Sequence, residues 1–260
     1  MSNYYKSQFY KKPIEVENIY WEILVIITDD QDREIIYSWY DIEENNSWSV
    51  YINKCLLWWL IHWIPQNVLI IGFWAWTYAK YIEDNFNTEV QITWIDIDPT
   101  MLEIAKKEFG IQTNDLYNLD AKDALQILSN KKKKYDLILI DVYDWSCEIP
   151  HYFQDKSFIE DISKVLSKKW IISINYSDYD LSDKKRSWHY QKIHDNLINT
   201  FWKNYSHMLI WENDRWNVMW IYNINKNYSA EDYNLNYLDL VQNWELVYDE
   251  NIIKDTILDK

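Results

Sequence analysis

The sequence predicts an α/β protein with a doubly wound, mainly parallel sheet and a small β-hairpin domain ahead of it. Short, continuously apolar segments recur along the chain from Asn67 onward. Each is followed by a segment with the spacing of an amphipathic helix, and this alternation is typical of a parallel sheet covered on both faces. A chain of 260 residues can form one sizeable domain with a small appendage.

The first fifty residues have a different pattern. Residues 18–40 hold two strand-like runs on either side of the polar segment 29–32, which predicts a hairpin. This acidic turn lacks the glycine and the bidentate glutamate of a calcium-binding EF-hand loop, so we interpret it as a solvated turn. We therefore place a β-hairpin domain in residues 1–50, a larger domain in residues 51–225 and a C-terminal tail or helix in residues 226–260.

The larger domain is predicted to begin with a helix over residues 49–63 and then to alternate regularly. Strands are expected at residues 67–71, 90–96, 115–119, 135–141, 170–175, 207–211 and 217–222. Helices are expected at residues 75–86, 99–109, 121–130, 156–167 and 188–203. Pro99 suits the first turn of its helix, and Asp98 before it is interpreted as the helix cap. In such a sheet, strand 67–71 should be central, between 90–96 and 135–141.

Composition excludes several classes of function. The formal net charge is −15, which argues against nucleic acid or an anionic membrane as a partner and is compatible with a cationic substrate. The sequence shows neither a membrane-spanning apolar run nor a signal-peptide core, so we expect a cytoplasmic protein. Cys55 and Cys147 share no motif, and His189 and His194 are five residues apart rather than four. We therefore expect no metal site.

The chain contains 2 glycines and 17 tryptophans. Proteins usually contain about 7 per cent glycine, because turns and helix ends need residues that tolerate positive φ. Tryptophan stands at several positions where a turn or a nucleotide would require glycine: Trp74, Trp76, Trp94, Trp145 and Trp170. A tryptophan-rich core is one explanation. We prefer another, that most of these letters stand for glycine encoded by UGA, as in some bacterial lineages. The abundance of Ile, Lys, Asn and Tyr agrees with an AT-rich genome.

With glycine restored, the segment after the first parallel strand becomes a glycine-rich turn of the kind that lets a nucleotide approach the backbone. Five segments then carry a resemblance: NVLIIGFWAWT, ITWIDIDPTMLEIAKKEF, LDAKDALQIL, YDLILIDVYDWSCEIPHYF and NVMWIYN. On these segments the chain resembles the spermidine synthase (polyamine aminopropyltransferase) family, which has the Rossmann-like fold of class I S-adenosylmethionine-dependent methyltransferases. The resemblance covers roughly residues 18–222.

This resemblance implies a site for S-adenosylmethionine or its decarboxylated form. The residues it assigns to cosubstrate binding are Gly72, Trp74, Ala75, Trp76, Asp96, Ile97, Asp120 and Ala121. Asp96 would hold the ribose hydroxyls, a role that its place at the end of the second parallel strand also supports. Asp120 would contact the amino group of adenine. We expect no metal cofactor.

The resemblance also implies an amine substrate at the end of strand 135–141. Transfer to an amine requires a carboxylate that binds the ammonium and helps to remove its proton. Asp141 would do this, with substrate contacts from Asp144, Tyr143 and Tyr51, and loop 145–156 would close over them. The alternative is that Asp141 merely ends its strand. Relatives of this kind are commonly homodimers or homotetramers.

Three departures from the family pattern keep the reaction open. Ala75 replaces the aspartate that grips the aminopropyl amine, and Tyr51-Ile52-Asn53 replaces a Tyr-His-Glu segment. Ile70 stands where a methyltransferase usually has an acid. We expect aminopropyl transfer to a diamine such as putrescine. A methyltransferase acting on a small acceptor is the first alternative, and a catalytically silent binding module is the second.

We predict that the codons for Trp74, Trp76, Trp94, Trp145 and Trp170 are UGA and that the native protein carries glycine there. Sequencing the gene tests this directly, and peptide masses of the native protein provide an independent check. UGG codons at Trp74 and Trp76, or peptide masses that show tryptophan at these positions in the native protein, would contradict the prediction.

Overall fold

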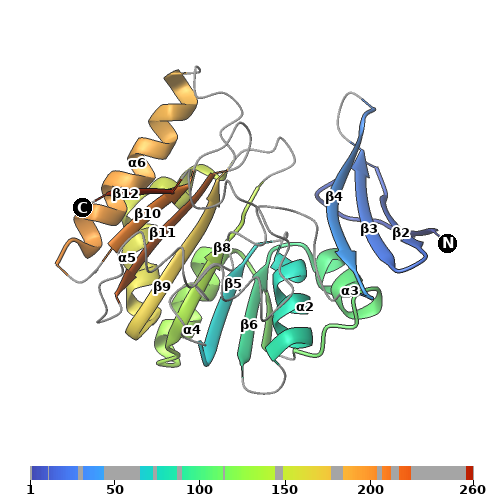
Figure 1. Ribbon diagram of the computed structural model, residues 1–260, viewed down its shortest axis with the longest axis horizontal. Coiled ribbons are helices and arrows are strands. Elements are labelled where there is room, and N and C mark those ends of the chain that lie inside the picture. Colours follow the sequence, from blue (N-terminus) through green and yellow to red (C-terminus); the bar gives the residue numbers. More distant parts are fainter. Residues whose placement is uncertain are drawn as a thin grey trace.

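The computed structural model describes residues 2–10, 12–28, 32–43, 65–72, 75–86, 90–113, 115–143, 149–176, 184–203, 207–211, 217–223 and 256–259. These residues form two sheets, one of four strands and one of eight, with helices packed against the larger sheet (Figure 1). The helix expected over residues 49–63 lies outside the described residues. No helix in the described ranges is long and apolar enough to cross a membrane.

The smaller sheet, here called the N-terminal sheet, is entirely antiparallel. Its strands follow chain order: β1 (Ser2–Tyr5), β2 (Ile14–Ile19), β3 (Glu22–Thr28) and β4 (Glu34–Asp41). The predicted hairpin is β3 and β4, and β1 and β2 extend it by two strands that the sequence analysis did not predict. Buried residues alternate along β2 and β3, so one face of the sheet forms a core.

The larger sheet has the predicted mainly parallel core. Its parallel strands are β5 (Asn67–Ile71), β6 (Gln91–Asp96), β7 (Asp115–Asn118), β8 (Tyr135–Ile140) and β9 (Leu166–Tyr176). Their order is β9-β8-β5-β6-β7, so β5 lies between β8 and β6, as predicted. Three antiparallel strands extend the β9 edge: β11 (Asn217–Asn223), β10 (His207–Trp211) and β12 (Thr256–Asp259). The α/β fold class is confirmed.

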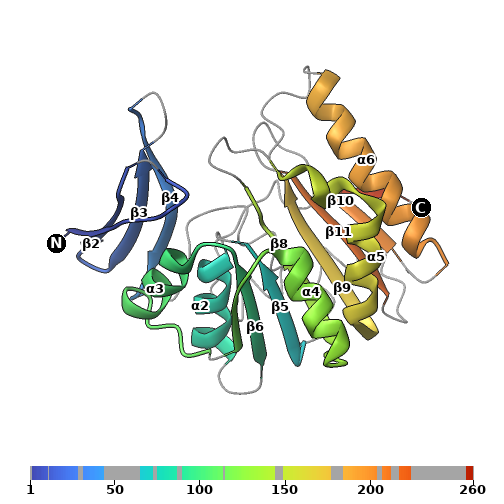
Figure 2. The same cartoon turned by 180° about the vertical axis from the view of Figure 1, so that it is seen from behind.

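Helices follow the parallel strands as the alternation predicts. They are α2 (Ala75–Phe86), α3 (Pro99–Lys107), α4 (Ala121–Asn130), α5 (Lys156–Val165) and α6 (Lys184–Phe201). A short 3-10 turn, η3 (His151–Gln154), precedes α5. Helices α4, α5 and α6 lie side by side over one face of the sheet (Figure 2), where their apolar side chains form the main buried core.

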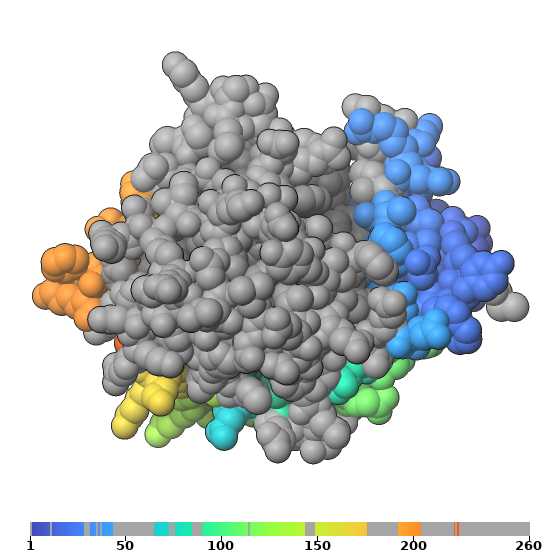
Figure 3. All heavy atoms as spheres, viewed as in Figure 1, coloured from blue at the N-terminus to red at the C-terminus, as the bar shows by residue number. Residues whose placement is uncertain are grey.

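Polar contacts tie the N-terminal sheet to the helices of the larger one. The hydroxyls of Ser38 and Thr77 are 2.6 Å apart and buried, and the Tyr40 hydroxyl donates to Asp84 at 2.6 Å. The amide of Asn3 donates to Glu108, just beyond α3, at 2.9 Å. The N-terminal sheet and α6 lie at opposite ends of the molecule (Figure 3).

One expectation about a chain segment was wrong. Trp170 was predicted to occupy a turn before its strand, but β9 begins four residues earlier and Trp170 lies inside it, 4% exposed. Pairing across the sheet decided this, and local sequence carries no signal for it. Of the expected C-terminal tail or helix over residues 226–260, the described part, Thr256–Asp259, is strand β12, which pairs with β10, and the rest lies outside the described residues.

We predict that Gly72→Ala is far more destabilising than Gly110→Ala. Both glycines have positive φ, 105° and 65°. A Cβ on Gly72 would lie 2.1 Å from the carbonyl oxygen of Asp141, whereas a Cβ on Gly110 would meet nothing within 4 Å. Backbone strain alone costs about 1–2 kcal/mol at Gly110, and the added overlap should raise the loss at Gly72 above ~3 kcal/mol. Denaturant unfolding of both variants measures this, and equal losses would contradict the packing described.

Candidate functional site

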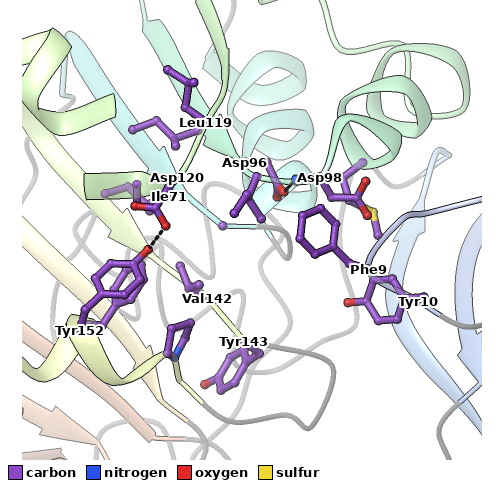
Figure 4. Close-up of a pocket in the computed structure, with 17 residues that line it drawn as sticks. Phe9, Tyr10, Ile71, Asp96, Asp98, Leu119, Asp120, Val142, Tyr143 and Tyr152 are labelled. Carbon is purple, nitrogen blue, oxygen red and sulfur yellow. Dashed lines mark hydrogen bonds between the residues drawn. The ribbon is translucent and has the colours of Figure 1, made fainter. Parts of the chain in front are cut away.

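A cavity of about 260 Å³ lies at the carboxyl ends of the central parallel strands (Figure 4). Doubly wound sheets bind their ligands at this edge. The residues that line it are Phe9, Tyr10, Ile71, Gly72, Ile95, Asp96, Ile97, Asp98, Met101, Leu119, Asp120, Ala121, Val142, Tyr143, Pro150, Tyr152 and Phe153. Most of this lining is apolar, with a few carboxylates among it, which is the usual character of a small-molecule site.

Strand register brings three predicted residues to the same level of the sheet. Ile71 of β5 pairs with Ile95 of β6 and with Ile140 of β8. The next residues along these strands, Gly72, Asp96 and Asp141, therefore lie side by side at the edge, with Gly72 in the middle. The Gly72 amide donates to the Ile95 carbonyl at 3.0 Å, which holds the end of β5 against β6.

Asp96 lines the cavity and is 5% exposed. Its Oδ1 accepts the backbone amide of Asp98 at 2.8 Å, and its Oδ2 is buried with no hydrogen-bond partner among the residues that the structure describes. Burial raises the pKa of the Asp96 carboxyl to about 8, with a smaller raising effect from the Asp98 charge and an opposing effect from the Asp98 amide. A buried carboxyl oxygen that faces a cavity without a hydrogen-bond partner can accept a hydrogen bond from a bound ligand.

Asp98 caps helix α3, as predicted, since its Oδ1 accepts the Thr100 amide at 2.9 Å. Its Oδ2 accepts the buried hydroxyl of Ser7. This bond anchors the segment before β2, and that segment places Phe9 and Tyr10 in the cavity wall (Figure 4). The sequence analysis missed both aromatic residues, because nothing in the local pattern indicates that a segment some ninety residues upstream packs against the α3 cap.

Asp120 lines the other side of the cavity. It caps α4 through its Oδ1, which accepts the Lys122 amide at 2.9 Å. Its Oδ2 accepts the hydroxyl of Tyr152 at 2.9 Å (Figure 4). Two of its predicted companions in cosubstrate binding, Ile97 and Ala121, line the cavity as well. Tyr152 was not among the predicted site residues.

Asp141 is 1% exposed and lies beside the cavity rather than in its lining. The amide of Asn175, on β9, donates to its Oδ1 at 3.0 Å, and the Tyr78 hydroxyl also interacts with the carboxylate. Burial raises the pKa of the Asp141 carboxyl to about 8, against the lowering influence of Asn175 and of the Tyr78 hydroxyl. The residues that follow it, Val142 and Tyr143, do line the cavity. Asp96 and Asp141 therefore belong to one edge of the sheet.

Several predicted site residues cannot be placed in this geometry. Trp74, Tyr51, Asp144 and Trp145 lie outside the described residues, as does the start of the expected loop 145–156. Ala75 is the first residue of α2. The described part of the loop, from Ile149 onward, supplies Pro150, Tyr152 and Phe153 to the cavity wall.

The expectation for two tryptophans was wrong in its geometry. An indole at Trp76 was expected to fill the nucleotide space, but Trp76 is fully buried and stacks on Phe109, with ring centroids 4.6 Å apart. The Trp94 indole is also fully buried and donates to the Gly72 carbonyl at 3.0 Å. Neither has the positive φ that would require glycine, and Trp170 does not either. The codon assignment itself remains a prediction.

Among the described side chains, no group of three or more His, Cys, Asp or Glu residues is arranged to hold a metal ion. The described residues at this edge offer carboxylates, tyrosine hydroxyls and backbone amides around an apolar cavity. Such a set can bind a nucleoside through hydrogen bonds and can accept a proton from a cationic group.

The model of the spermine/spermidine synthase domain matches residues 60–226, which is more than half of the chain. The chain belongs to the spermine/spermidine synthase family. The matched region contains Gly72, Asp96, Asp120 and Asp141, and so covers the whole carboxyl edge of the parallel sheet apart from the N-terminal segment that adds Phe9 and Tyr10.

The curated proteins that the chain resembles include methyltransferases and aminopropyltransferases. The chain is 26% identical over 133 residues to the human eEF1A lysine and N-terminal methyltransferase, a match that covers 46% of this chain and 19% of the relative. It is 31% identical over 101 residues to the polyamine aminopropyltransferase of Oceanobacillus iheyensis, covering 36% of this chain and 20% of the relative. Each match spans about a fifth of the length of the relative.

Solved structures show the same fold at low identity. A probable spermidine synthase from Corynebacterium glutamicum superposes with a TM-score of 0.67 at 15% identity, covering 93% of this chain and 87% of that one. Human methyltransferase-like protein 13, solved with SAH, gives a TM-score of 0.57 at 18% identity over 78% of this chain and 94% of that one. These likenesses establish the fold, which is shared by proteins of both kinds.

We predict that the free protein loses stability as pH rises from about 4 to about 8. The pKa values of Asp96 and Asp141 are raised by burial from 3.8 to about 8, so the folded state retains protons that the unfolded state has already released. Each unit of such a shift costs about 1.4 kcal/mol at the alkaline end. Urea unfolding at pH 5, 7 and 9 measures the effect.

The variant Asp141→Asn cannot ionise at this position, and its stability should fall less over the same pH range. Asp136→Asn, at the opposite end of β8, is the matched control and should follow the wild type. A wild-type stability that is flat or rising between pH 5 and 9 would contradict the prediction.

Proposed function

We propose that this chain is a transferase that uses S-adenosylmethionine or its decarboxylated form as cosubstrate, and that its leading reaction is aminopropyl transfer to a diamine such as putrescine. The observation that carries the proposal is the pair of carboxylates, Asp96 and Asp120, on two sides of an apolar cavity at the switch point of a spermidine synthase-family sheet. A small cationic acceptor also agrees with the net charge of −15.

In this proposal the cavity holds the nucleoside part of the cosubstrate. The free Oδ2 of Asp96 accepts a ribose hydroxyl, which compensates its burial. Asp120 faces the amino group of the base, and the apolar side chains of Leu119, Val142 and Phe153 exclude water from its faces. Gly72 leaves room for the ribose, because no side chain extends from the middle strand at this level.

Aminopropyl transfer needs a neutral amine, whereas the free diamine is an ammonium. Asp141 is proposed to take the proton, after which the amine nitrogen forms a bond to the carbon beside the sulfonium and the carbon–sulfur bond breaks to release a thioether. Asn175 holds one oxygen of Asp141, and the other oxygen, Oδ2, is proposed to receive the proton. Tyr143, in the cavity wall next to Asp141, is proposed to orient the acceptor. Bringing both reactants together out of water supplies much of the remaining acceleration.

Methyl transfer is the second candidate, favoured by two observations. Ala75 offers no carboxylate for the amine of an aminopropyl group, although the family pattern has an aspartate at this position. One of the curated relatives is also a methyltransferase of a protein lysine and N-terminus, and both acceptors are amines. A catalytically silent member of the family is the third candidate, and it rests on the same losses at Ala75 and Ile52.

Product analysis separates the three candidates. The chain, produced from its gene with UGA read as glycine, is incubated with putrescine and either decarboxylated S-adenosylmethionine or S-adenosylmethionine. Methylthioadenosine released from the first cosubstrate supports aminopropyl transfer, and S-adenosylhomocysteine released from the second supports methyl transfer. If neither product forms while both nucleosides bind, the silent module is the correct description.

We predict opposite effects for two substitutions at the site. Asp141→Asn removes the proton acceptor but leaves the cavity wall intact, so kcat should fall by ~100-fold or more while cosubstrate affinity changes by less than about threefold. Asp96→Ala removes the ribose acceptor, so the cosubstrate Kd should rise by roughly 10-fold with a smaller change in kcat at saturation. Steady-state kinetics with equilibrium binding distinguish the two. A large loss of binding in Asp141→Asn would contradict the assignment of Asp141 to the chemical step.

A further inference from the structure

Both oxygens of the Asp120 carboxylate are already engaged at the cavity wall. Oδ1 accepts the Lys122 amide and Oδ2 accepts the Tyr152 hydroxyl, each at 2.9 Å. We propose that Tyr152 is a positioning residue that fixes the Asp120 carboxylate in the orientation that selects a purine carrying an amino group over one carrying a carbonyl at the same position. The inference rests on the proposed function, because it concerns the base of the proposed cosubstrate.

The two hydrogen bonds hold the two oxygens of Asp120 from different elements. The bond to Lys122 is part of the N-cap of α4, so the side chain cannot turn away without uncapping the helix. The bond from Tyr152 comes from η3, which places the tyrosine hydroxyl next to Asp120 (Figure 4). An ionised carboxylate only accepts hydrogen bonds, and each oxygen can accept two. Oδ2 can therefore accept one further hydrogen bond, from a donor on the ligand. The bond from Tyr152 fixes the direction from which that donor must approach.

Tyr152 is itself held rigidly. Its ring lies against Phe153 and Phe158, with centroids 4.6 Å and 5.5 Å away. The turn that carries it is tied to α6 by the Asn196 amide, which donates to the Gln154 carbonyl at 2.7 Å. Burial, and then the bond to Asp120, raises the pKa of the Tyr152 hydroxyl above its ordinary value. The hydroxyl therefore stays protonated and acts as a donor to Asp120.

This arrangement distinguishes two neutral purines by whether they present a hydrogen-bond donor or an acceptor to Asp120. The amino group of adenine can donate to the free direction of Asp120 Oδ2. Hypoxanthine has a carbonyl oxygen in its place, which would face the carboxylate without a proton between them, and an unpaired buried acceptor is costly. The preference requires a fixed carboxylate, because one that can rotate or take up water would lose part of its favourable contact with adenine.

Binding of two thionucleosides tests the inference. Dissociation constants for 5′-methylthioadenosine and 5′-methylthioinosine are measured by calorimetry on the wild type and on Tyr152→Phe, which keeps the ring and removes the hydroxyl. We expect the wild type to prefer methylthioadenosine. In Tyr152→Phe its affinity for methylthioadenosine should fall by roughly tenfold, with a much smaller change for methylthioinosine, so that the preference narrows.

Tyr117→Phe is the matched control. The Tyr117 hydroxyl also takes part in a hydrogen bond, accepting from the Lys131 ammonium at 3.0 Å, but Tyr117 does not line the cavity. Its removal should leave both affinities unchanged. A double-mutant cycle with Asp120→Asn adds a second measurement. Since Tyr152 is proposed to act only through Asp120, the two substitutions should lower the base preference by no more in combination than Asp120→Asn does alone.

The other outcomes distinguish a failure of the role of Tyr152 from a failure of the proposed function. Unchanged binding in Tyr152→Phe, or an equal loss for both nucleosides, would overturn the role of Tyr152 and leave the proposed function standing. Fully additive losses in the double-mutant cycle would do the same. A wild type that binds neither nucleoside would overturn the proposed function and this inference with it.

Discussion

The geometry of the site depends on the close packing of the backbone at Gly72 against Asp141. At this point β5 ends between β6 and β8, and any side chain on Gly72 would collide with the Asp141 carbonyl. The absence of a Cβ lets the two outer strands present Asp96 and Asp141 at the same level, with open space above the middle strand. The absence of a side chain at Gly72 therefore both allows the strands to pack closely and leaves the cavity open.

Burial gives the two strand-end carboxylates their chemical character. Each has one oxygen that accepts an amide hydrogen bond within the protein, from the Asp98 backbone and from the Asn175 side chain respectively. In the free protein this arrangement opposes folding at alkaline pH, because ionised carboxylates are poorly solvated there. The same property prepares both groups for ligands that bring donors or a positive charge. Asp98 and Asp120 differ from them, since each caps a helix and each of their carboxylate oxygens accepts a hydrogen bond within the protein.

Aromatic residues from distant parts of the chain complete the cavity. Phe9 and Tyr10 arrive from the segment ahead of β2, anchored by the bond between Ser7 and Asp98. Tyr152 arrives from η3 and bonds to the α4 cap. In both cases a helix-capping aspartate, predictable from local sequence, is also the attachment point for a remote segment. The caps thus connect the secondary structure of the sheet to the shape of the site.

The sequence by itself determined the parallel core, because continuous apolar strands and capped helices are local patterns that fix element type and order. It also placed Asp96, Asp120 and Asp141 at strand ends or helix caps. Only the tertiary structure decided what lies beside them. The partners Asn175, Tyr152 and Ser7 are 32 to 91 residues away from the aspartates they bond. It also decided the surroundings of the tryptophans: Trp76 stacks on Phe109, and the Trp94 indole donates to the Gly72 carbonyl, which are contacts between elements that no single-residue preference encodes.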